Sequence, residues 1–292
     1  MARYLNPFTD VGFKQIFGQE MSKDILISFL NALLEGERAI TDLVFLDKER
    51  LRQDKEHRGL LYDIYCTTDT GEHIIVEMQN KFQATFRDRA LYYAATDIAR
   101  QGIKGSDWNY KLTPVYGVYF LNFKFRETEL AKLRTDVALA DMATGEQFSD
   151  KLRMIFLQLP LFDLTEEECD TDFKKWLYVL NNMQTFDRMP FAAQKAVFDR
   201  LGSIAEIANM PKEERWAYEE SLRIYRDNLA IAETEFNSGF AKGEARGEAR
   251  GEARGREGQM CENIQAMRKN GFDDETIARI FSIPVDKVKS VR

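Results

Sequence analysis

LLYDIYCT (60–67) and EHIIVEMQ (72–79) decide the fold of this chain, because they have the composition of the two strands of a β-hairpin. Both runs are rich in β-branched and aromatic residues, and the turn-forming sequence TDTG (68–71) separates them. Gly71 can adopt the positive φ that a tight turn requires. We therefore predict an antiparallel strand pair with its turn centred on Thr70.

This register places three polar residues on one face of the hairpin. Asp63 lies directly opposite Glu77, and Gln79 follows two residues later, so its side chain points to the same face. The other face is apolar and carries Leu60, Tyr62, Ile64, Cys66, Ile74, Val76 and Met78. Such a division predicts a sheet that is covered on one side only.

Asp63 and Glu77 would repel each other, because like charges directly opposite destabilise a strand pair. A divalent cation would offset that repulsion, and Mg²⁺ is commonly held by one or two carboxylates together with water and a substrate phosphate. A bound cation of this kind supports phosphodiester hydrolysis by polarising the phosphoryl group and activating water. Gln79 would orient that water or contact the phosphate, but it lacks the positive charge that a lysine would bring.

A simpler interpretation is that both carboxylates are solvated residues on an exposed sheet face. The hairpin alone favours this interpretation slightly, because carboxylates on solvent-facing strands are common. A glycosidase that uses the acid pair is poorly supported, since the two acids would lie on adjacent strands without a visible sugar-stacking cleft.

The composition is that of a globular protein in a reducing compartment. The 292 residues are 44% hydrophobic and 12% aromatic, which indicates a substantial core. The three cysteines are far apart, which suits a cytoplasmic location, and with only two histidines they show no zinc-ligand spacing. Because no secretory leader and no apolar run of membrane-spanning length is evident, we expect no membrane partner.

The charge distribution leaves room for a nucleic-acid partner. The net charge of −7 counts against one, since phosphate contacts usually need a basic surface. The segment after the hairpin, however, has a local basic surplus that includes Lys81, Arg87, Arg89, Arg100, Lys104 and Lys111.

Hydrophobic periodicity predicts an α/β protein. We expect helices over 9–18, 22–34 and 86–101, with Phe86, Leu91, Ala94 or Ala95, and Ile98 of the last one pointing inward. Further strands are expected over 43–47, 115–123 and 156–162, the last ended by Pro160. From about residue 171 onward the pattern becomes helical, including 190–202 and 212–240.

The order of these segments resembles that of the recombination-promoting nuclease and transposase family of the PD-(D/E)XK superfamily. The similarity covers roughly residues 5–180 and is carried by DVGFKQIFG (10–18), ILISFLNALL (25–34), YDIYC (62–66), IIVEMQ (74–79), Arg89-x-x-Tyr92-Tyr93 through ARQG (99–102), YKLTPVYGVYFLNF (110–123), LQLPLF (157–162) and Trp176-Leu177. This ordered series shifts the balance toward a metal site at the acid pair.

The resemblance implies a restriction-endonuclease-like fold, with a mixed central sheet flanked by helices, and Mg²⁺-dependent cleavage of DNA. It assigns metal binding, by Mg²⁺ or another divalent cation, to Asp63 and Glu77, and the third catalytic position to Gln79. Gln79 departs from the lysine of the wider superfamily, so a catalytically weak or inactive protein that binds DNA or partner chains is the alternative. The transposase label implies a link to recombination or mobile elements.

Four basic residues are candidates for DNA contacts: Lys14, Arg87, Arg89 and Arg100. For each of them an ordinary exposed position on an amphipathic helix is the simpler interpretation. We expect a homo-oligomer, because two cuts on a duplex are easiest for a dimer.

The C-terminal third contains a low-complexity repeat, GEAR-GEAR-GEAR-GREG (243–258). We predict a nuclease-like domain over 1–170, a helical region over 171–238, a repeat segment over 239–258 and a small helical tail over 259–292. The repeat segment is either a flexible linker or a helix that forms through self-association, since glycine weakens a helix and identical charges recur every four residues.

Overall fold

The computed structural model describes residues 2–46, 62–102, 109–125, 132–192 and 194–291. The chain forms two compact units, Met1–Asn228 and Leu229–Arg292. The hairpin, the sheet and the helices that cover it all belong to the first unit.

A six-stranded mixed sheet forms the centre of the first unit, in the order β1-β2-β3-β4-β6-β5. The β1–β2, β2–β3 and β5–β6 pairs are antiparallel, whereas β3–β4 and β4–β6 are parallel. The strands are β1 (Leu43–Phe45), β2 (Ile64–Thr68), β3 (His73–Gln79), β4 (Val115–Leu121), β5 (Arg134–Ala140) and β6 (Gln147–Gln158). The mixed sheet predicted from the sequence is thereby confirmed.

The predicted register of the hairpin is also confirmed. Ile64 pairs with Val76 and Tyr65 pairs with Ile75, so Asp63, which precedes β2, comes next to Glu77. Gly71 has the expected positive φ, 94°. The turn therefore sets the relative position of the two acids, because a slip of one residue would send one of them to the opposite face.

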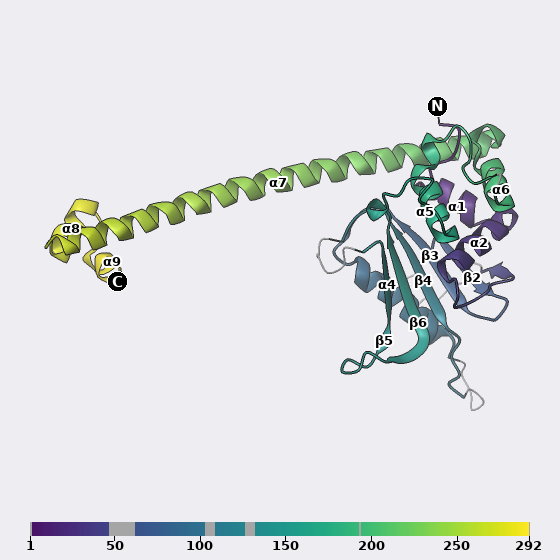
Figure 1. Ribbon diagram of the computed structural model, residues 1–292, viewed down its shortest axis with the longest axis horizontal. Helices are drawn as coiled ribbons and strands as arrows, with labels where there is room; N and C mark the ends of the chain where they lie inside the picture. The colour runs from purple at the N-terminus through teal and green to yellow at the C-terminus, as the bar shows by residue number, and fades with distance from the viewer. Residues whose placement is uncertain (1, 47–61, 103–108, 126–131, 193, 292) are drawn as a thin grey trace. The chain divides into compact units, whose positions relative to one another are not determined.

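Helices cover both faces of the sheet (Figure 1). One face packs against α1 (Asp10–Phe17), α2 (Lys23–Leu33), α5 (Asp172–Asn182) and α6 (Ala196–Ala205). The other face is covered by α4 (Phe86–Arg100), which connects the parallel strands β3 and β4. Short 3₁₀ turns lie at Glu20–Ser22, Leu159–Leu161, Met183–Thr185 and Ile207–Asn209.

The expectation that the sheet has one covered side is wrong. The face that carries Glu77 also carries Tyr65 and Ile75, which are buried against α4. Tyr62 packs on this same side, with its ring centroid 5.1 Å from that of Tyr65, and not on the opposite face as predicted. Leu60 lies outside the described residues. This second face is covered because the connection between the parallel strands β3 and β4 contains α4, which packs against the sheet.

Two further expectations differ from the structure. Leu91 is 48% exposed, and the buried face of α4 is formed instead by Phe86, Ala90, Ala94 and Asp97. The sequence did not predict β5, and β6 begins at Gln147 and not near residue 156. Most of β5 and the first part of β6 are exposed, so their side chains lack the alternation that marks a half-buried strand.

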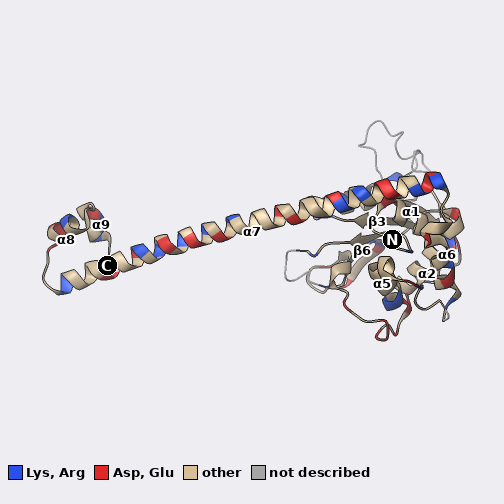
Figure 2. Ribbon diagram, turned by 90° about the horizontal axis from the view of Figure 1, so that it is seen from above, with Lys and Arg blue, Asp and Glu red and all other residues tan. Residues whose placement is uncertain are grey.

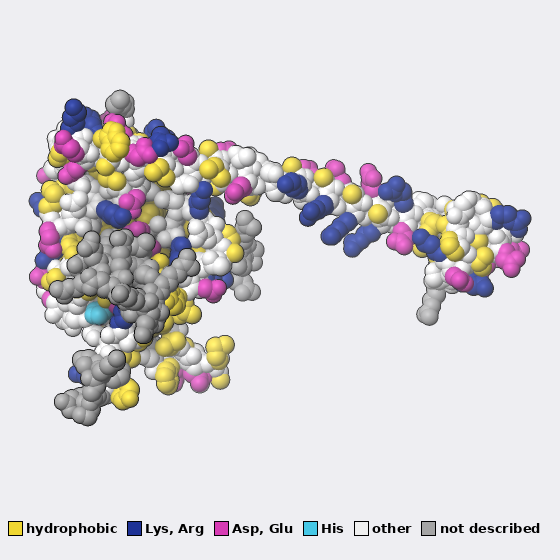
Figure 3. Space-filling model, turned by 180° about the vertical axis from the view of Figure 1, so that it is seen from behind, with side chains coloured by type: hydrophobic (Ala, Val, Ile, Leu, Met, Phe, Trp, Pro, Cys, Tyr) yellow, Lys and Arg dark blue, Asp and Glu magenta, His cyan; other side chains and the backbone are white. Residues whose placement is uncertain are grey.

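The C-terminal repeat lies within a long helix, α7 (Lys212–Lys269), and its side chains are exposed. Acidic and basic residues alternate along it (Figure 2), and basic side chains gather along one side of it (Figure 3). The tail adds α8 (Asp274–Phe281) and α9 (Val285–Ser290), with a small core of Ile264, Ile277, Ala278 and Val288. The proposed domain boundaries stay a prediction. Within the described ranges, no helix is both long and apolar enough to cross a bilayer.

Gly117 makes room for a buried tyrosine beside the candidate site. A Cβ atom at this position would lie 2.7 Å from the Tyr119 ring. That ring cannot easily move, because it stacks on Phe156 at 5.0 Å and meets Phe86 edge-on at 5.7 Å. We predict that Gly117→Ala lowers the free energy of unfolding by about 1–3 kcal/mol, as overpacking of a dense core does. Urea denaturation followed by circular dichroism measures this.

The control for this prediction is Gly247→Ala, because nothing lies within 4 Å of a Cβ atom at that helical position. It should leave the urea midpoint unchanged or raise it. Equal midpoints for Gly117→Ala and the wild type would show that the Tyr119 ring adapts at no cost.

Candidate functional site

The hairpin brings two carboxylates together at the sheet face below α4. The Asp63 carboxylate accepts a hydrogen bond from the Met78 amide at 2.8 Å, and the Asp63 amide donates to Glu77 Oε1 at 3.3 Å. These reciprocal bonds run across the strand pair, so each acid is held by the backbone of the opposite strand. The predicted proximity of Asp63 and Glu77 is therefore present in the fold.

Glu77 is buried, with 5% of its surface exposed. It lies opposite Tyr119 of β4, whose hydroxyl donates to the Ala90 carbonyl of α4 at 3.1 Å. The pKa of Glu77 is raised to about 8. Burial is the main cause and the negative charge of Asp63 adds to it, while the hydrogen bonds from the Asp63 amide and Gln79 and the positive charge of Arg89 oppose the rise. The fold thus holds the Glu77 carboxylate where hydrogen bonds and positive charge only partly offset the cost of burying its charged form.

Gln79 connects Glu77 to a basic residue of α4. Its Nε2 donates to Glu77 Oε2 at 3.1 Å, and its Oε1 accepts a hydrogen bond from the Arg89 guanidinium. Arg89 also donates to Gln83 Oε1 at 2.9 Å. The three residues proposed as catalytic and Arg89 therefore form one connected group, drawn from β3, α4 and the position just before β2.

The other three basic candidates occupy different surroundings. Lys14 pairs with Asp10 at 2.5 Å on α1, a helix of the opposite face of the sheet. Arg87 is exposed and lies over the Phe125 ring, 4.8 Å from its centroid. Arg100 lies in the last turn of α4, at the far end from Arg89. Their role in binding DNA stays a prediction.

Asp97 was not singled out in the sequence, yet it is a buried polar residue on the same face as Glu77. Its carboxylate accepts a hydrogen bond from the Tyr65 hydroxyl and lies 2.7 Å from His73 Nδ1. Only 2% of Asp97 is exposed. Its spacing from the buried Phe86 and Ala94 of α4 matches the helical period, so an acid on the apolar stripe was the signal that could have identified it.

The acid pair has the donor chemistry of a hard divalent cation. In the part of the chain that the structure describes, no group of three or more His, Cys, Asp or Glu side chains converges on one point. Two neighbouring carboxylates, of which Glu77 is buried, nonetheless match Mg²⁺, which takes one or two protein oxygens and completes its shell with water and phosphate. Asp63 and Glu77 are accordingly the residues that could hold such a cation.

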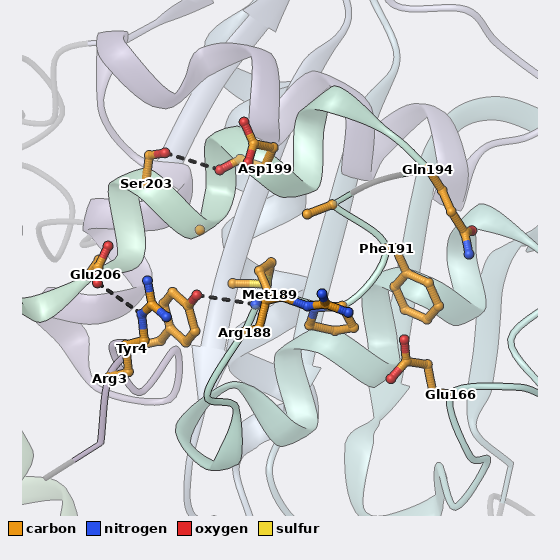
Figure 4. Close-up of a pocket in the computed structure, with 13 residues that line it drawn as sticks. Arg3, Tyr4, Glu166, Arg188, Met189, Phe191, Gln194, Asp199, Ser203 and Glu206 are labelled. Atoms are coloured by element: carbon orange, nitrogen blue, oxygen red, sulfur yellow. Dashed lines mark hydrogen bonds and ion pairs between the residues drawn. The ribbon is translucent and has the colours of Figure 1, made fainter.

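A pocket of about 490 Å³ lies elsewhere, between the N-terminal segment, residues 188–192 and α6 (Figure 4). Its lining includes Tyr4, Met189 and Phe191, together with charges of both signs. Arg3 is already engaged there by Glu206 at 2.9 Å and by the Asp187 carbonyl at 2.6 Å. Neither the acid pair nor Gln79 lines this pocket.

Comparison with known proteins places the chain in a family. The sequence model of the PD-(D/E)XK nuclease family transposases matches residues 7–235. The chain belongs to this family. No curated protein and no solved structure matches it. The family match and the six-stranded mixed sheet with flanking helices confirm the expected restriction-endonuclease-like α/β fold of this PD-(D/E)XK protein.

The raised pKa of Glu77 predicts a pH-dependent stability. The folded chain keeps the Glu77 proton up to about pH 8, whereas a glutamate in the unfolded chain has its ordinary pKa of 4.5. Folded-state stability should therefore fall as pH rises from about 4.5 to 8, because the folded state binds more protons in this window. We predict that Glu77→Gln in the presence of EDTA is more stable than the wild type at pH 8, by about 2 kcal/mol, with the gain shrinking toward pH 5.

Thermal melts at several pH values measure this difference. Asp88→Asn is the control, because Asp88 is an exposed acid on α4 and should leave the pH dependence of the wild type in place. A stability difference between Glu77→Gln and the wild type that is the same at pH 5 and pH 8 would contradict the prediction.

Proposed function

We propose that this chain is a metal-dependent DNA endonuclease that hydrolyses phosphodiester bonds. The observation that supports this most is the buried Glu77 carboxylate held beside Asp63 in a member of a nuclease family. A fold that places two carboxylates next to each other, one of them buried, has the oxygen ligands that a divalent cation prefers. We further propose a role in recombination or mobile-element biology, in keeping with the transposase family.

In this proposal Asp63 and Glu77 hold Mg²⁺ or another divalent cation. When bound, such a cation polarises a phosphoryl oxygen and lowers the pKa of a coordinated water. The backbone amides of Asp63 and Met78 orient the two carboxylates, so the site is preorganised by the strand pair. Gln79 holds Glu77 through its amide nitrogen, which keeps that carboxylate in one orientation.

DNA would approach the surface that α4 and the end of β3 share. Arg87, Arg89 and Arg100 of α4 are the proposed phosphate contacts, and Lys14 of α1 is a fourth. Contacts to phosphates carry no sequence information. Because they displace counterions from the DNA, this part of the proposal implies DNA binding that weakens steeply as the salt concentration rises. A homo-oligomer and a reducing cytoplasmic location stay predictions from the sequence. Cys66, Cys169 and Cys261 are free thiols, which is compatible with the latter.

The second candidate is a protein of the same fold that binds DNA or partner chains without cleaving it. The uncharged Gln79 at the third catalytic position and the net charge of −7 favour this alternative. It predicts salt-sensitive DNA binding without metal-dependent cleavage.

A plasmid cleavage assay tests the proposal. Purified protein with Mg²⁺ should convert supercoiled plasmid into nicked and linear forms, and EDTA should stop the reaction. Asp63→Asn and Glu77→Gln should each slow cleavage by about 100-fold or more, since each removes a charge at the reacting centre. Both substitutions keep the size of the side chain, so the packing below α4 is preserved.

The matched control is Asp88→Asn, which removes an exposed acid of α4 and should cleave at the wild-type rate. Equal cleavage by the wild type and Glu77→Gln would assign the activity to another site or to a contaminant. DNA binding without cleavage by the wild type would favour the second candidate.

A further inference from the structure

We propose that Arg89 is a further catalytic residue, which supplies to the phosphodiester the positive charge that Gln79 lacks. This inference rests on the proposed nuclease function. Its basis is the position of the guanidinium, which comes from α4, a different element from the hairpin, and still contacts the third catalytic position directly.

The contact with Arg89 determines what Gln79 can do. A guanidinium has only donors, so the side of the Gln79 amide that faces Arg89 must be its carbonyl oxygen. The amide nitrogen is thereby directed to Glu77 Oε2, at 3.1 Å. The carbonyl oxygen of Gln79 already accepts a hydrogen bond from Arg89. The Gln79 side chain therefore acts on Glu77 as a hydrogen-bond donor and does not accept a hydrogen bond from the attacking water. Gln79 consequently positions Glu77, and the charge has to come from elsewhere.

Arg89 is held where that charge is needed. Its guanidinium lies 5.7 Å from the Phe86 ring centroid and donates to Gln83 at 2.9 Å, so packing and hydrogen bonding fix it from two sides. The bonds to Gln79 and Gln83 engage two of the five N–H donors that a guanidinium has. A phosphate oxygen pair needs two donors in the planar fork that arginine presents.

Arg89 is linked to the acid pair through Gln79, which it contacts directly and which donates to Glu77 Oε2 at 3.1 Å. With a divalent cation on the two carboxylates, the charges of ion and acids would cancel. The negative charge of a bound phosphodiester would then be met by the guanidinium of Arg89.

Arg87 shows that position on α4, and not mere basic character, distinguishes Arg89. It lies only two residues away, yet it is exposed and covers the Phe125 ring at 4.8 Å. A substitution there removes the same charge from the same helix without touching Gln79. Arg87→Ala therefore offers a comparison in which a proposed phosphate contact is lost and the charge beside Gln79 is kept.

Cleavage kinetics of the full chain test this role. Arg89→Ala should lower kcat for plasmid cleavage by about 100-fold while changing KM for DNA by less than about threefold, because the charge acts mainly on the transition state. Arg89→Lys should recover part of the loss. Arg87→Ala should instead raise KM for DNA, because Arg87 is proposed only as a phosphate contact. Asp88→Asn, which changes an exposed acid of the same helix, should keep both kcat and KM within about twofold of the wild type. Affinity for Mn²⁺, measured by isothermal titration in place of Mg²⁺, should stay equal or become tighter in Arg89→Ala, since a neighbouring positive charge is gone.

A second-site variant makes the test specific. If Arg89 supplies the missing charge, Gln79→Lys combined with Arg89→Ala should restore kcat to within about tenfold of the wild type, because the lysine places a charge at the same point. A merely structural role for Arg89 would not be rescued in this way.

The outcomes distinguish a failure of the proposed nuclease function from a failure of the proposed role of Arg89. An inactive wild type together with an inactive Asp88→Asn would overturn the nuclease function itself. An active wild type with an equally active Arg89→Ala would overturn only the role of Arg89. The role of Arg89 would also be overturned if the Gln79→Lys, Arg89→Ala double variant cleaved no faster than Arg89→Ala. The same holds if the Mn²⁺ affinity of Arg89→Ala fell in proportion to its activity.

Discussion

Glu77 lies beneath α4 with Asp63 beside it. The other contacts of the site can be understood from this arrangement, in which one carboxylate is buried next to a second carboxylate. An ionised acid in such surroundings is unfavourable unless opposite charge or hydrogen bonds compensate it. The chain provides the hydrogen bonds from the Asp63 amide and from Gln79, and it provides charge from Arg89. The remaining imbalance raises the pKa of Glu77, which is the condition that a divalent cation would relieve.

The two faces of the sheet have different roles. The face covered by α1, α2, α5 and α6 holds the larger apolar core, rich in phenylalanine and leucine. The face below α4 is smaller and includes tyrosines and ionisable groups among its buried residues, such as Tyr119, Glu77 and Asp97. A strong core on one side allows the other side to hold polar groups that do not maximise stability, as functional sites commonly do.

The pocket near Tyr4 and Phe191 and the candidate chemistry do not coincide. In that pocket Arg3 is engaged by an ion pair with Glu206 and by the Asp187 carbonyl, whereas the acid pair lies at the sheet and α4. A nuclease does not need an enclosed pocket, because its substrate is an extended polymer whose phosphates lie on the outside. Charge and metal-binding geometry are therefore better guides to its site than cavity volume.

The sequence by itself determined the hairpin, its register and the pairing of Asp63 with Glu77, because a tight turn and strict alternation are local features. It also determined α1, α2 and α4 and the buried strand β4, whose periodicity can be recognised without knowing the partners. Only the tertiary structure showed that α4 covers the acid face, that the exposed edge strand β5 exists, and that Arg89 meets Gln79. These features depend on which segments pack together across the fold, and neither hydrophobic spacing nor turn chemistry specifies such contacts.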